Sequence, residues 1–418
     1  MLFPVHNLFG QRMNAPDMRS VNGIQLLNLI HSRGPISRAE LSKLSGLSKP
    51  TVSEQVSRLL RVGAVIETGQ GESGGSGGKR PTMVSFNAAG GKVAGVDIGA
   101  EQMRFAIADL EGRILRQMKV AARNDKSPAR VREQIERSLL SLCGGGEQDL
   151  RAIGIGVPGR VDCTSGVVLE LGNVFEWKNV DLRTPLEARF GCPVRVDNDV
   201  NVALAAEIRN GAGQGAHTTV LIQAGTGIGS AIAIGRKLHH GAHWAAGEIG
   251  HFTTQPPSGK ESNPRGQMES ILGEDQIAQR VKTAAKRSPI LRRFLQTLGP
   301  VSALFAAAAE SDPIALSLAS PIENYAAVAV ANLALAYDPD TVLLSGEIFR
   351  YVLPAIEKLL SRTVPWSPKV RPARFGEEGV LMGAVDTALP AAYEQMASLL
   401  AADASTMPTI AAVKAGSH

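Results

Sequence analysis

Five short apolar runs recur between residues 93 and 349, and each carries glycine or acidic residues near its end. They lie at 93–99, 152–162, 193–200, 219–238 and 340–349. Ala-rich stretches that suit helices separate them, and alternation of strands with helices is typical of an α/β fold. Such folds bind ligands at the carboxyl ends of their strands. The pattern therefore predicts an α/β body with a ligand site at these ends.

Length and hydropathy limit the class of protein. A chain of 418 residues exceeds one ordinary core, so we expect roughly two to three domains. Residues 326–337 form the longest nearly apolar run, which is shorter than a membrane span, so we expect a core helix there and no membrane partner. The first residues lack the pattern of a secretory signal. The expected location is the cytoplasm.

The three cysteines, Cys143, Cys163 and Cys192, are scattered through the chain without paired spacing. This argues against a disulfide framework and for a reducing compartment. We interpret all three as small buried residues.

Charge is concentrated at the start of the chain. Residues 1–90 hold ten Lys and Arg against five acidic residues, whereas the remaining residues hold 34 of each kind. The whole net charge of +5 therefore sits in the first segment. This distribution suggests a polyanion-binding module joined to a neutral body.

That first segment has the pattern of a winged helix-turn-helix over residues 19–88. Helical spacing over 21–30 stops at Gly34, and Ser37 with Glu40 forms a capping box for a short second helix. Gly46 then supplies the turn, and Ser48 begins a third helix. Two β-rich runs joined by a Gly/Ser tip follow, as expected for a wing.

The third helix and the wing tip carry the residue types that meet DNA. Short hydroxyls and an amide can reach base edges, and cationic side chains suit phosphates or a narrow minor groove. The expected DNA-binding residues are Ser48, Lys49, Thr51, Ser53, Gln55, Arg58, Lys79 and Arg80. The alternatives are a winged helix used only for protein contacts and a solvated basic face.

The motifs of the body follow one another in a specific order. They are DIG at 97–99, GVPGRVD at 156–162, NDVN at 198–201, GTGIG at 225–229, GEIGH at 247–251 and MES at 268–270. Over residues 91–386 this order resembles the ROK family (repressors, open reading frames and kinases), and the winged helix resembles its repressor branch. The resemblance implies a two-lobed, actin-like ATPase fold and a homodimer or homotetramer.

The ends of the chain lie outside that match. We expect residues 1–18 to form a flexible N-terminal arm and residues 387–418 to form a C-terminal helix and a disordered tail.

The resemblance also implies a sugar site. Residues that contact sugar hydroxyls in ROK sugar kinases correspond here to Asn173, Asn198, Asp199, Glu248, His251 and Glu269. The chemistry is suitable, because carboxylates, amides and an imidazole give directional hydrogen bonds to the hydroxyls of a pyranose. The alternative is that these polar groups only satisfy loop backbone.

The first phosphate loop departs from the kinase pattern. Family kinases have a Gly-Gly-Thr-Lys loop after the first strand, whereas this chain continues from Gly99 with Ala100, Glu101 and Gln102. A carboxylate repels ATP phosphates and a β-carbon hinders close backbone approach. We therefore expect no ATP binding and no kinase activity. Asp199, which would be the general base of a kinase, is left as a hydrogen-bond acceptor.

The zinc loop of the family is also altered. The three places that hold cysteine in most members hold Lys260, Ser262 and Gln267 here. One histidine without sulfur partners cannot complete a structural zinc site, so we expect the chain to hold no metal cofactor and His251 to be free for a sugar.

These observations predict a sugar-responsive transcriptional regulator. Its partners would be double-stranded operator DNA and a sugar or sugar phosphate, and its role would be repression of carbohydrate-metabolism genes. Two alternatives remain open: an active sugar kinase with an added DNA-binding domain, and a DNA-binding protein whose ROK domain is only a dimerisation scaffold. The sugar, the operator and the sign of the response stay undetermined.

Overall fold

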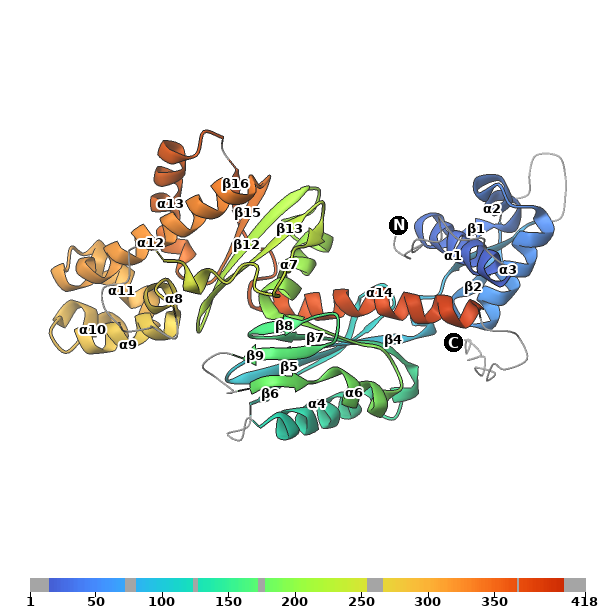
Figure 1. Cartoon of the computed structure of the whole chain (residues 1–418), viewed down its shortest axis with the longest axis horizontal. Helices are drawn as coiled ribbons and strands as arrows, with labels where there is room; N and C mark the ends of the chain where they lie inside the picture. Colours follow the sequence, from blue (N-terminus) through green and yellow to red (C-terminus); the bar gives the residue numbers. More distant parts are fainter. Residues whose placement is uncertain are drawn as a thin grey trace.

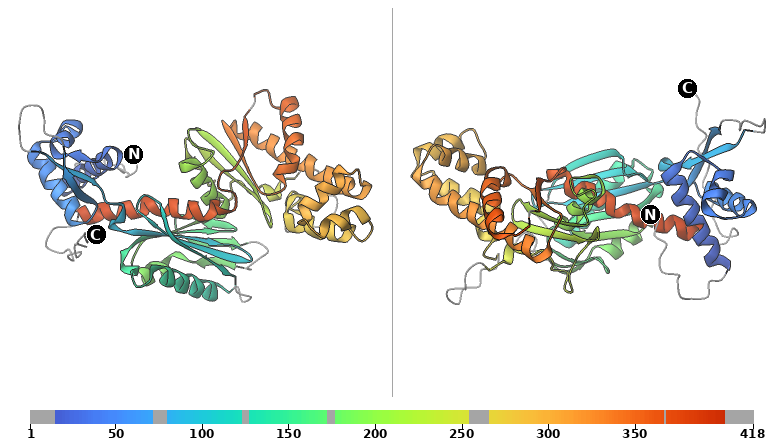
Figure 2. Two further views of the ribbon diagram at one scale, coloured as in Figure 1. Left: turned by 180° about the vertical axis from the view of Figure 1, so that it is seen from behind. Right: turned by 90° about the horizontal axis from the view of Figure 1, so that it is seen from above.

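The structure is a computed structural model that describes residues 15–71, 80–122, 127–171, 177–253, 266–366 and 368–401. Figure 1 shows a small N-terminal domain at one end of the molecule and two lobes that carry the rest of the chain. The long C-terminal helix runs from the junction of the lobes to the N-terminal domain, which the opposite view confirms (Figure 2).

The N-terminal domain is a winged helix-turn-helix, as the sequence predicted. Its helices are α1 (Ala15–Arg33), α2 (Arg38–Ser45) and α3 (Lys49–Arg61), and its sheet has the order β1 (Ile36–Ser37), β3 (Thr82–Phe86), β2 (Val65–Gln70). The side chain of Ser37 accepts a hydrogen bond from the N–H of Glu40, and Gly46 ends α2 with φ +73°. Helix α1 begins at Ala15, so helical structure starts inside the segment expected to be an arm.

The first lobe contains a five-stranded sheet of mixed direction. Its order is β11 (Val194–Asn198), β7 (Leu150–Val157), β4 (Lys92–Ile98), β5 (Gln102–Asp109), β6 (Ile114–Ala121). The first three strands run parallel, so β4, β7 and β11 end at the same edge. Helices α4 (Pro128–Cys143) and α6 (Arg183–Phe190) share a hydrophobic core with one face. A small sheet, β8 (Arg160–Asp162), β9 (Val167–Leu171) and β10 (Trp177–Asp181), extends this lobe.

The second lobe contains the other five-stranded sheet. Its order is β14 (Lys237–Leu238), β13 (Ile228–Ile234), β12 (Thr218–Ala224), β15 (Thr341–Ser345), β16 (Lys369–Pro372). Its helices are α8 (Glu269–Leu272), α9 (Glu274–Ala284), α10 (Pro289–Leu295), α11 (Pro300–Ala309), α12 (Pro313–Tyr337) and α13 (Phe349–Thr363). By length and composition α12 could cross a membrane, but many of its residues belong to the core of this lobe. It is the core helix that the sequence predicted.

Two helices connect the lobes with the winged helix. Helix α7 (Asp199–Asn210) packs along α14 (Gly379–Ala401) so closely that a β-carbon at Gly383 would lie 1.8 Å from the carbonyl oxygen of Val202. Near its end, α14 carries Tyr393, whose hydroxyl donates to the carbonyl oxygen of Leu110 at 2.5 Å and whose ring lies 6.3 Å from Phe86. The boundary expected at residue 386 therefore falls inside a continuous helix.

Candidate functional site

Asn198 is the last residue of β11 and the N-cap of α7. Its side-chain oxygen accepts hydrogen bonds from the N–H groups of Val200 at 2.9 Å and Asn201 at 3.1 Å, which caps the helix. Its amide nitrogen donates to the carbonyl oxygen of Gly159 at 3.0 Å. The oxygen is thus engaged by backbone, and the second amide hydrogen is the group that Asn198 could offer to a ligand.

Asp199 is the first residue of α7 and lies among other carboxylates. Burial raises the pKa of Asp199 to about 7, and the negative charges of Asp97 and Glu248 act in the same direction. Asp97 is the penultimate residue of β4 in the first lobe, whereas Glu248 belongs to the second lobe. Carboxylates from both lobes therefore meet at this point, and Asp199 exchanges its proton near neutral pH.

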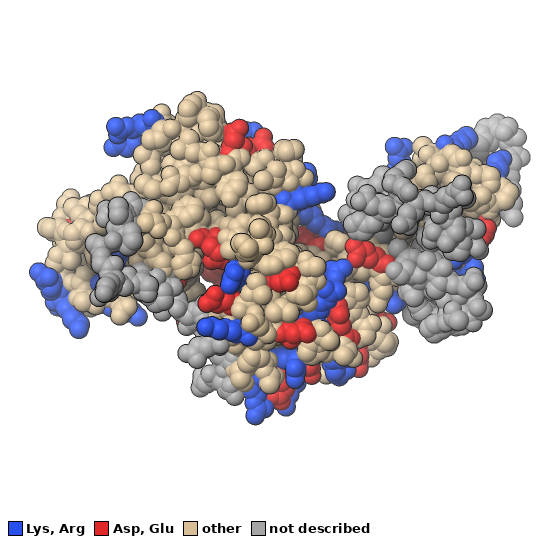
Figure 3. Space-filling model, viewed as in Figure 1, with Lys and Arg blue, Asp and Glu red and all other residues tan. Residues whose placement is uncertain are grey.

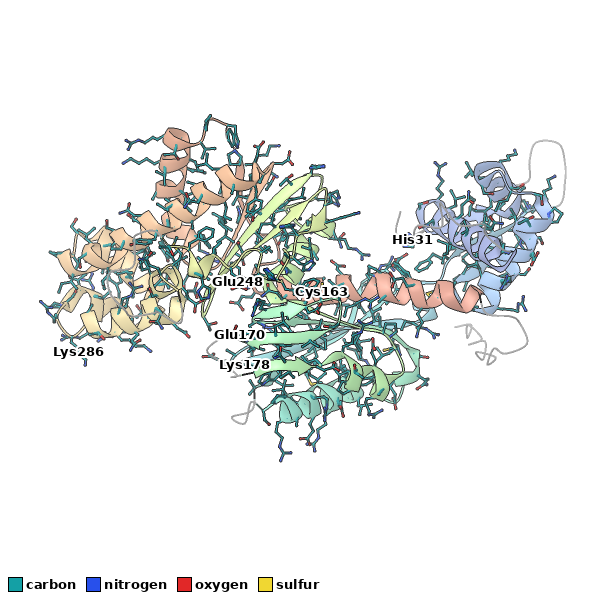
Figure 4. All side chains as sticks on the ribbon, in the orientation of Figure 1. His31, Cys163, Glu170, Lys178, Glu248 and Lys286 are labelled. Carbon is teal, nitrogen blue, oxygen red and sulfur yellow. The ribbon has the colours of Figure 1, made fainter. Side chains whose placement is uncertain are left out.

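Glu248 lies at the junction of the lobes, facing the part of the first lobe that carries Glu170 (Figure 4). Shielding from water raises the pKa of Glu248, while the charges of His251 and Arg160 lower it. It stands directly before a short 3-10 helix, Ile249–His251. Within this turn Ile249 is buried and His251 is exposed.

Glu269 is packed against the turn that holds His251. The N–H of Met268 donates to the carbonyl oxygen of Gly250 at 3.1 Å. A β-carbon at Gly227 would lie 2.8 Å from a carboxylate oxygen of Glu269, and one at Gly250 would lie 3.2 Å from the same oxygen. A side chain at Gly227 would displace the Glu269 carboxylate, which lies between the GTGIG and GEIGH motifs.

The structure brings five of the six predicted sugar-binding residues to one region. They are Asn198, Asp199, Glu248, His251 and Glu269, from two lobes and three separate segments. Asn173 lies outside the described residues. Acidic side chains gather around a hollow between the two lobes (Figure 3). Such a set can accept hydrogen bonds from several hydroxyl groups at once.

At the turn after β4, the carboxylate of Asp97 lies beside the guanidinium of Arg104. Asp97 is 7% exposed, and burial raises its pKa to about 6 although Arg104 opposes this. The Arg104 guanidinium lies 3.4 Å from the Asp97 carboxylate. It also donates to the carbonyl oxygen of Glu377 at 2.5 Å and pairs with the Glu377 carboxylate at 3.2 Å. Arg104 is therefore already engaged by carboxylate and carbonyl oxygens.

Carboxylates also flank the second glycine turn. The N–H of Glu274 donates to the carbonyl oxygen of Gly225 at 2.8 Å, and the Glu274 carboxylate accepts from the N–H of Glu347 at 3.1 Å. Burial raises the pKa of Glu274, and the nearby charges of Glu347 and Glu377 raise it further. A phosphate chain brought to this turn would meet negative charge.

The zinc set of the family does not fit this chain. Of the donors that the resemblance implies, His251 remains, and Gln267 replaces a thiolate beside it. An amide oxygen does not substitute for the sulfur ligand of a structural zinc site. The other two substituted positions, Lys260 and Ser262, lie outside the described residues.

Helix α3 presents most of the predicted DNA-binding side chains. Ser48, Lys49 and Ser53 are exposed, and Thr51 and Arg58 are partly exposed. The hydroxyl of Ser48 caps the helix by accepting from the N–H of Thr51 at 3.3 Å, and the two hydroxyl oxygens lie 2.8 Å apart. Arg80, at the base of the wing, is exposed, and Lys79 lies outside the described residues.

The prediction that Gln55 faces DNA is wrong. Gln55 is 1% exposed, and neither of its amide atoms has a hydrogen-bond partner within the described residues. It falls on the buried face of α3 with Val52, Val56 and Leu59. These positions have the spacing of one apolar helix stripe, so the spacing alone could have excluded Gln55 from the exposed face.

A second polar cluster was missed from the sequence. Nε2 of His240 lies 2.7 Å from Oδ2 of Asp197, and Cys163 completes a group whose ligand atoms lie within 4.8 Å of one another. Hydrogen bonds with Asp197 and Cys163 raise the pKa of His240 to about 10. Cys143 and Cys192 are buried as predicted, but Cys163 is partly exposed. Large sequence separations hid this cluster.

Comparisons with known proteins give consistent results for both parts of the chain. The model of the ROK family matches residues 93–390, and a model described as winged helix-turn-helix DNA-binding matches residues 20–66. A putative xylose repressor from Caldicellulosiruptor sp. (strain Rt8B.4) is 30% identical over 339 residues, which cover 79% of this chain and 84% of the relative.

Two solved structures are also similar. A ROK family transcriptional regulator, a homolog of the E. coli MLC protein, has a TM-score of 0.75 and 24% identity, covering 92% of this chain and 99% of that chain. A ROK family glucokinase from Streptomyces griseus, in complex with glucose and AMPPNP, has a TM-score of 0.58 and 30% identity, covering 71% of this chain and 99% of that chain.

Proposed function

The chain belongs to the ROK family, and from this premise we propose that it is a sugar-responsive transcriptional regulator that represses carbohydrate-metabolism genes. The observation that carries the proposal is the convergence of Asn198, Asp199, Glu248, His251 and Glu269 between two lobes of a chain that also bears a winged helix. The proposed partners are operator DNA and a sugar, and the proposed location is the cytoplasm. A homodimer or homotetramer would present paired winged helices to DNA.

The charge of the region favours a neutral sugar over a sugar phosphate. Asp97, Asp199, Glu248 and Glu269 all contribute carboxyl groups, and the opposing charges at Glu248 come from His251 and Arg160. Carboxylates accept hydrogen bonds from hydroxyls but repel a phosphate. We therefore infer an unphosphorylated sugar as the preferred effector.

Kinase activity is not part of the proposal, even though the GTGIG turn is intact. The charges of Glu347 and Glu377 act on Glu274 beside this turn, and Arg104 is engaged with Asp97 and Glu377. ATP would have to displace these contacts and overcome carboxylate repulsion. The similarity to glucokinases makes this the alternative that an experiment must address directly.

The proposed mechanism uses two states of the lobes. A sugar held by Asp199 from one lobe and by Glu248 from the other would favour the closed arrangement. Helix α7 begins at Asp199 and packs on α14, which reaches the winged helix. A change in lobe angle would move the winged helices of a dimer and so alter their fit to paired half-sites.

One screen tests the proposal against both alternatives. The full-length chain is heated with each member of a library of sugars and sugar phosphates, and the same mixtures with ATP are assayed for ADP. Stabilisation by a neutral sugar without ADP release is the expected result. Sugar-dependent ADP release would indicate a kinase, and no response to any compound would indicate a scaffold.

A further inference from the structure

Cys163, Asp197 and His240 come from three separate elements and meet between the two lobes. Cys163 follows β8 and Asp197 lies in β11, both in the first lobe, whereas His240 follows β14 in the second lobe. Among the described residues these three form a group of potential metal ligands whose donor atoms all lie within 4.8 Å of one another. Figure 4 places Cys163 close to the junction of the lobes. The cluster thus joins side chains of the two lobes in a donor set that suits a metal ion.

The donor set is the one that zinc prefers. Zinc binds thiolate, imidazole and carboxylate in tetrahedral sites, at about 2.3 Å from sulfur and about 2.0–2.2 Å from nitrogen or oxygen. Donor atoms around such an ion are about 3.3–3.8 Å apart. The donor atoms now lie between 2.7 Å apart, for the hydrogen-bonded His240 and Asp197, and up to 4.8 Å apart. Zinc would therefore replace this hydrogen bond: His240 and Asp197 move apart, and the more widely spaced donors move closer. Three protein ligands leave the fourth position for water or another small ligand.

The surrounding contacts orient the ligands. Oδ1 of Asp197 accepts from the N–H of Asn198 at 2.7 Å and from the side-chain amide of Asn201 at 3.1 Å. This leaves Oδ2 directed at His240, from which it lies 2.7 Å. The His240 ring packs edge-on against Trp244 at 5.7 Å, and the His240 carbonyl accepts from the N–H of Ala246 at 3.1 Å. Ligands held in this way by outer contacts are typical of metal sites.

We propose that Cys163, Asp197 and His240 form a zinc site that ties the two lobes together. It differs from the family's zinc loop in position and in ligands, and it does not depend on whether a sugar binds. A metal held by ligands from both lobes stabilises the arrangement in which they meet. Because Asp197 precedes Asn198 and bonds its N–H, the ion lies next to the cap of α7 and influences the same lobe movement.

Cobalt substitution tests the site in the full-length chain. Co²⁺ alone is added to metal-free protein while the thiolate-to-cobalt charge-transfer band and the visible bands of tetrahedral cobalt are recorded. One equivalent is expected to produce both signals, and Zn²⁺ is expected to displace it. Cys163→Ala is expected to abolish the charge-transfer band, and His240→Gln is expected to weaken binding by at least about tenfold.

Cys192→Ala is the matched control, because Cys192 is a buried thiol outside the cluster. It is expected to keep the cobalt spectrum of the wild-type chain. Circular dichroism and the unfolding midpoint without metal show whether each variant is folded. A wild-type chain that binds cobalt only with octahedral spectra, or a charge-transfer band that survives Cys163→Ala, would overturn the proposal and leave an ordinary ion pair between His240 and Asp197.

Discussion

Gln55 shows how a single side chain can be misassigned when residue type is weighed before position. An amide on a recognition helix suits base edges, yet this one lies beneath α3 in the core of the winged helix. A buried amide without hydrogen-bond partners costs about 1–3 kcal/mol relative to a paired one. The side chain is therefore a source of instability in the domain rather than a contact with DNA.

Gln55→Leu is expected to raise the free energy of unfolding by about 1 kcal/mol, since leucine fills a similar volume without unpaired polar atoms. Operator affinity is expected to stay within about twofold, because the residue is covered. Urea unfolding and a DNA-binding titration measure the two effects. A tenfold loss of DNA affinity in a folded variant would show that Gln55 contributes to the DNA interface.

Asp199 gives sugar binding a definite pH dependence. Its pKa in the free protein is about 7, and a sugar hydroxyl that donates to the ionised carboxylate lowers that value. Affinity is therefore expected to rise as pH increases through about 7 and then to level off. Calorimetric titrations between pH 5.5 and 8.5, roughly a unit and a half on each side, measure this profile.

Asp199→Asn is expected to bind sugar more weakly and to lose the rise near pH 7. The charge of Asp97 helps to raise the pKa of Asp199, so Asp97→Asn is the comparison variant that should retain the step but show it at lower pH. A flat profile in the wild-type chain would mean that Asp199 does not meet the ligand.

At the scale of elements, the strand and helix pattern predicted most of the architecture. Strands β4, β7, β11, β12 and β15 each overlap one of the five apolar runs, because buried strands need continuous apolar residues. Strands β4, β7 and β12 begin one or two residues before their runs. The C-terminal boundary of the ROK domain could not be predicted from such a pattern. Helix α14 passes through residue 386 without a cap or break, and its continuity depends on packing against α7 and the sheet rather than on local signals.

Some residues of the candidate site could be predicted from local sequence, and others could not. The motif residues could be predicted because their functional side chains are close together in the sequence, in short segments such as 198–199 and 248–251. His240 and Asp197 are 43 positions apart, and no local pattern connects them. Their meeting follows from how two sheets are arranged about α7, which is a tertiary property.

The wing carries its own prediction. Arg80→Ala is expected to weaken DNA binding and to reduce the slope of log affinity against log salt by about one, as loss of one phosphate contact requires. Arg113→Ala, an exposed cation in the first lobe, is the matched control and should leave the slope unchanged. Filter binding or fluorescence anisotropy at several salt concentrations gives the slopes. An unchanged slope for Arg80→Ala would show that Arg80 is away from the phosphates.

For the whole molecule, α14 provides the physical connection between the ligand region and the winged helix. It packs on α7, on β4 and β7 of the first lobe, and on α1. Asp386 of α14 pairs with Arg209 of α7 at 3.3 Å, and burial raises the pKa of Asp386 to about 7. A lobe movement that shifts α7 therefore has a packed route to the N-terminal domain.

Tyr393→Phe tests this route with minimal change in volume. It removes the hydroxyl that bonds the Leu110 carbonyl and Arg209 of α7, while keeping the ring beside Phe86. Sugar affinity and operator affinity measured separately are expected to change by less than about threefold, while the effect of sugar on operator affinity falls. Full coupling in this variant would mean that the contacts of the Tyr393 hydroxyl with the first lobe and with α7 play no part.

The central claim is that a sugar bound between the lobes changes the affinity of the winged helix for DNA. The direct measurement is operator affinity with and without the sugar that stabilises the chain, using an operator selected from random DNA. We expect a change of at least about fivefold in the wild-type chain, and loss of that response in Glu248→Gln with sugar-free operator affinity retained. A sugar that binds the wild-type chain and leaves its operator affinity unchanged would contradict the account.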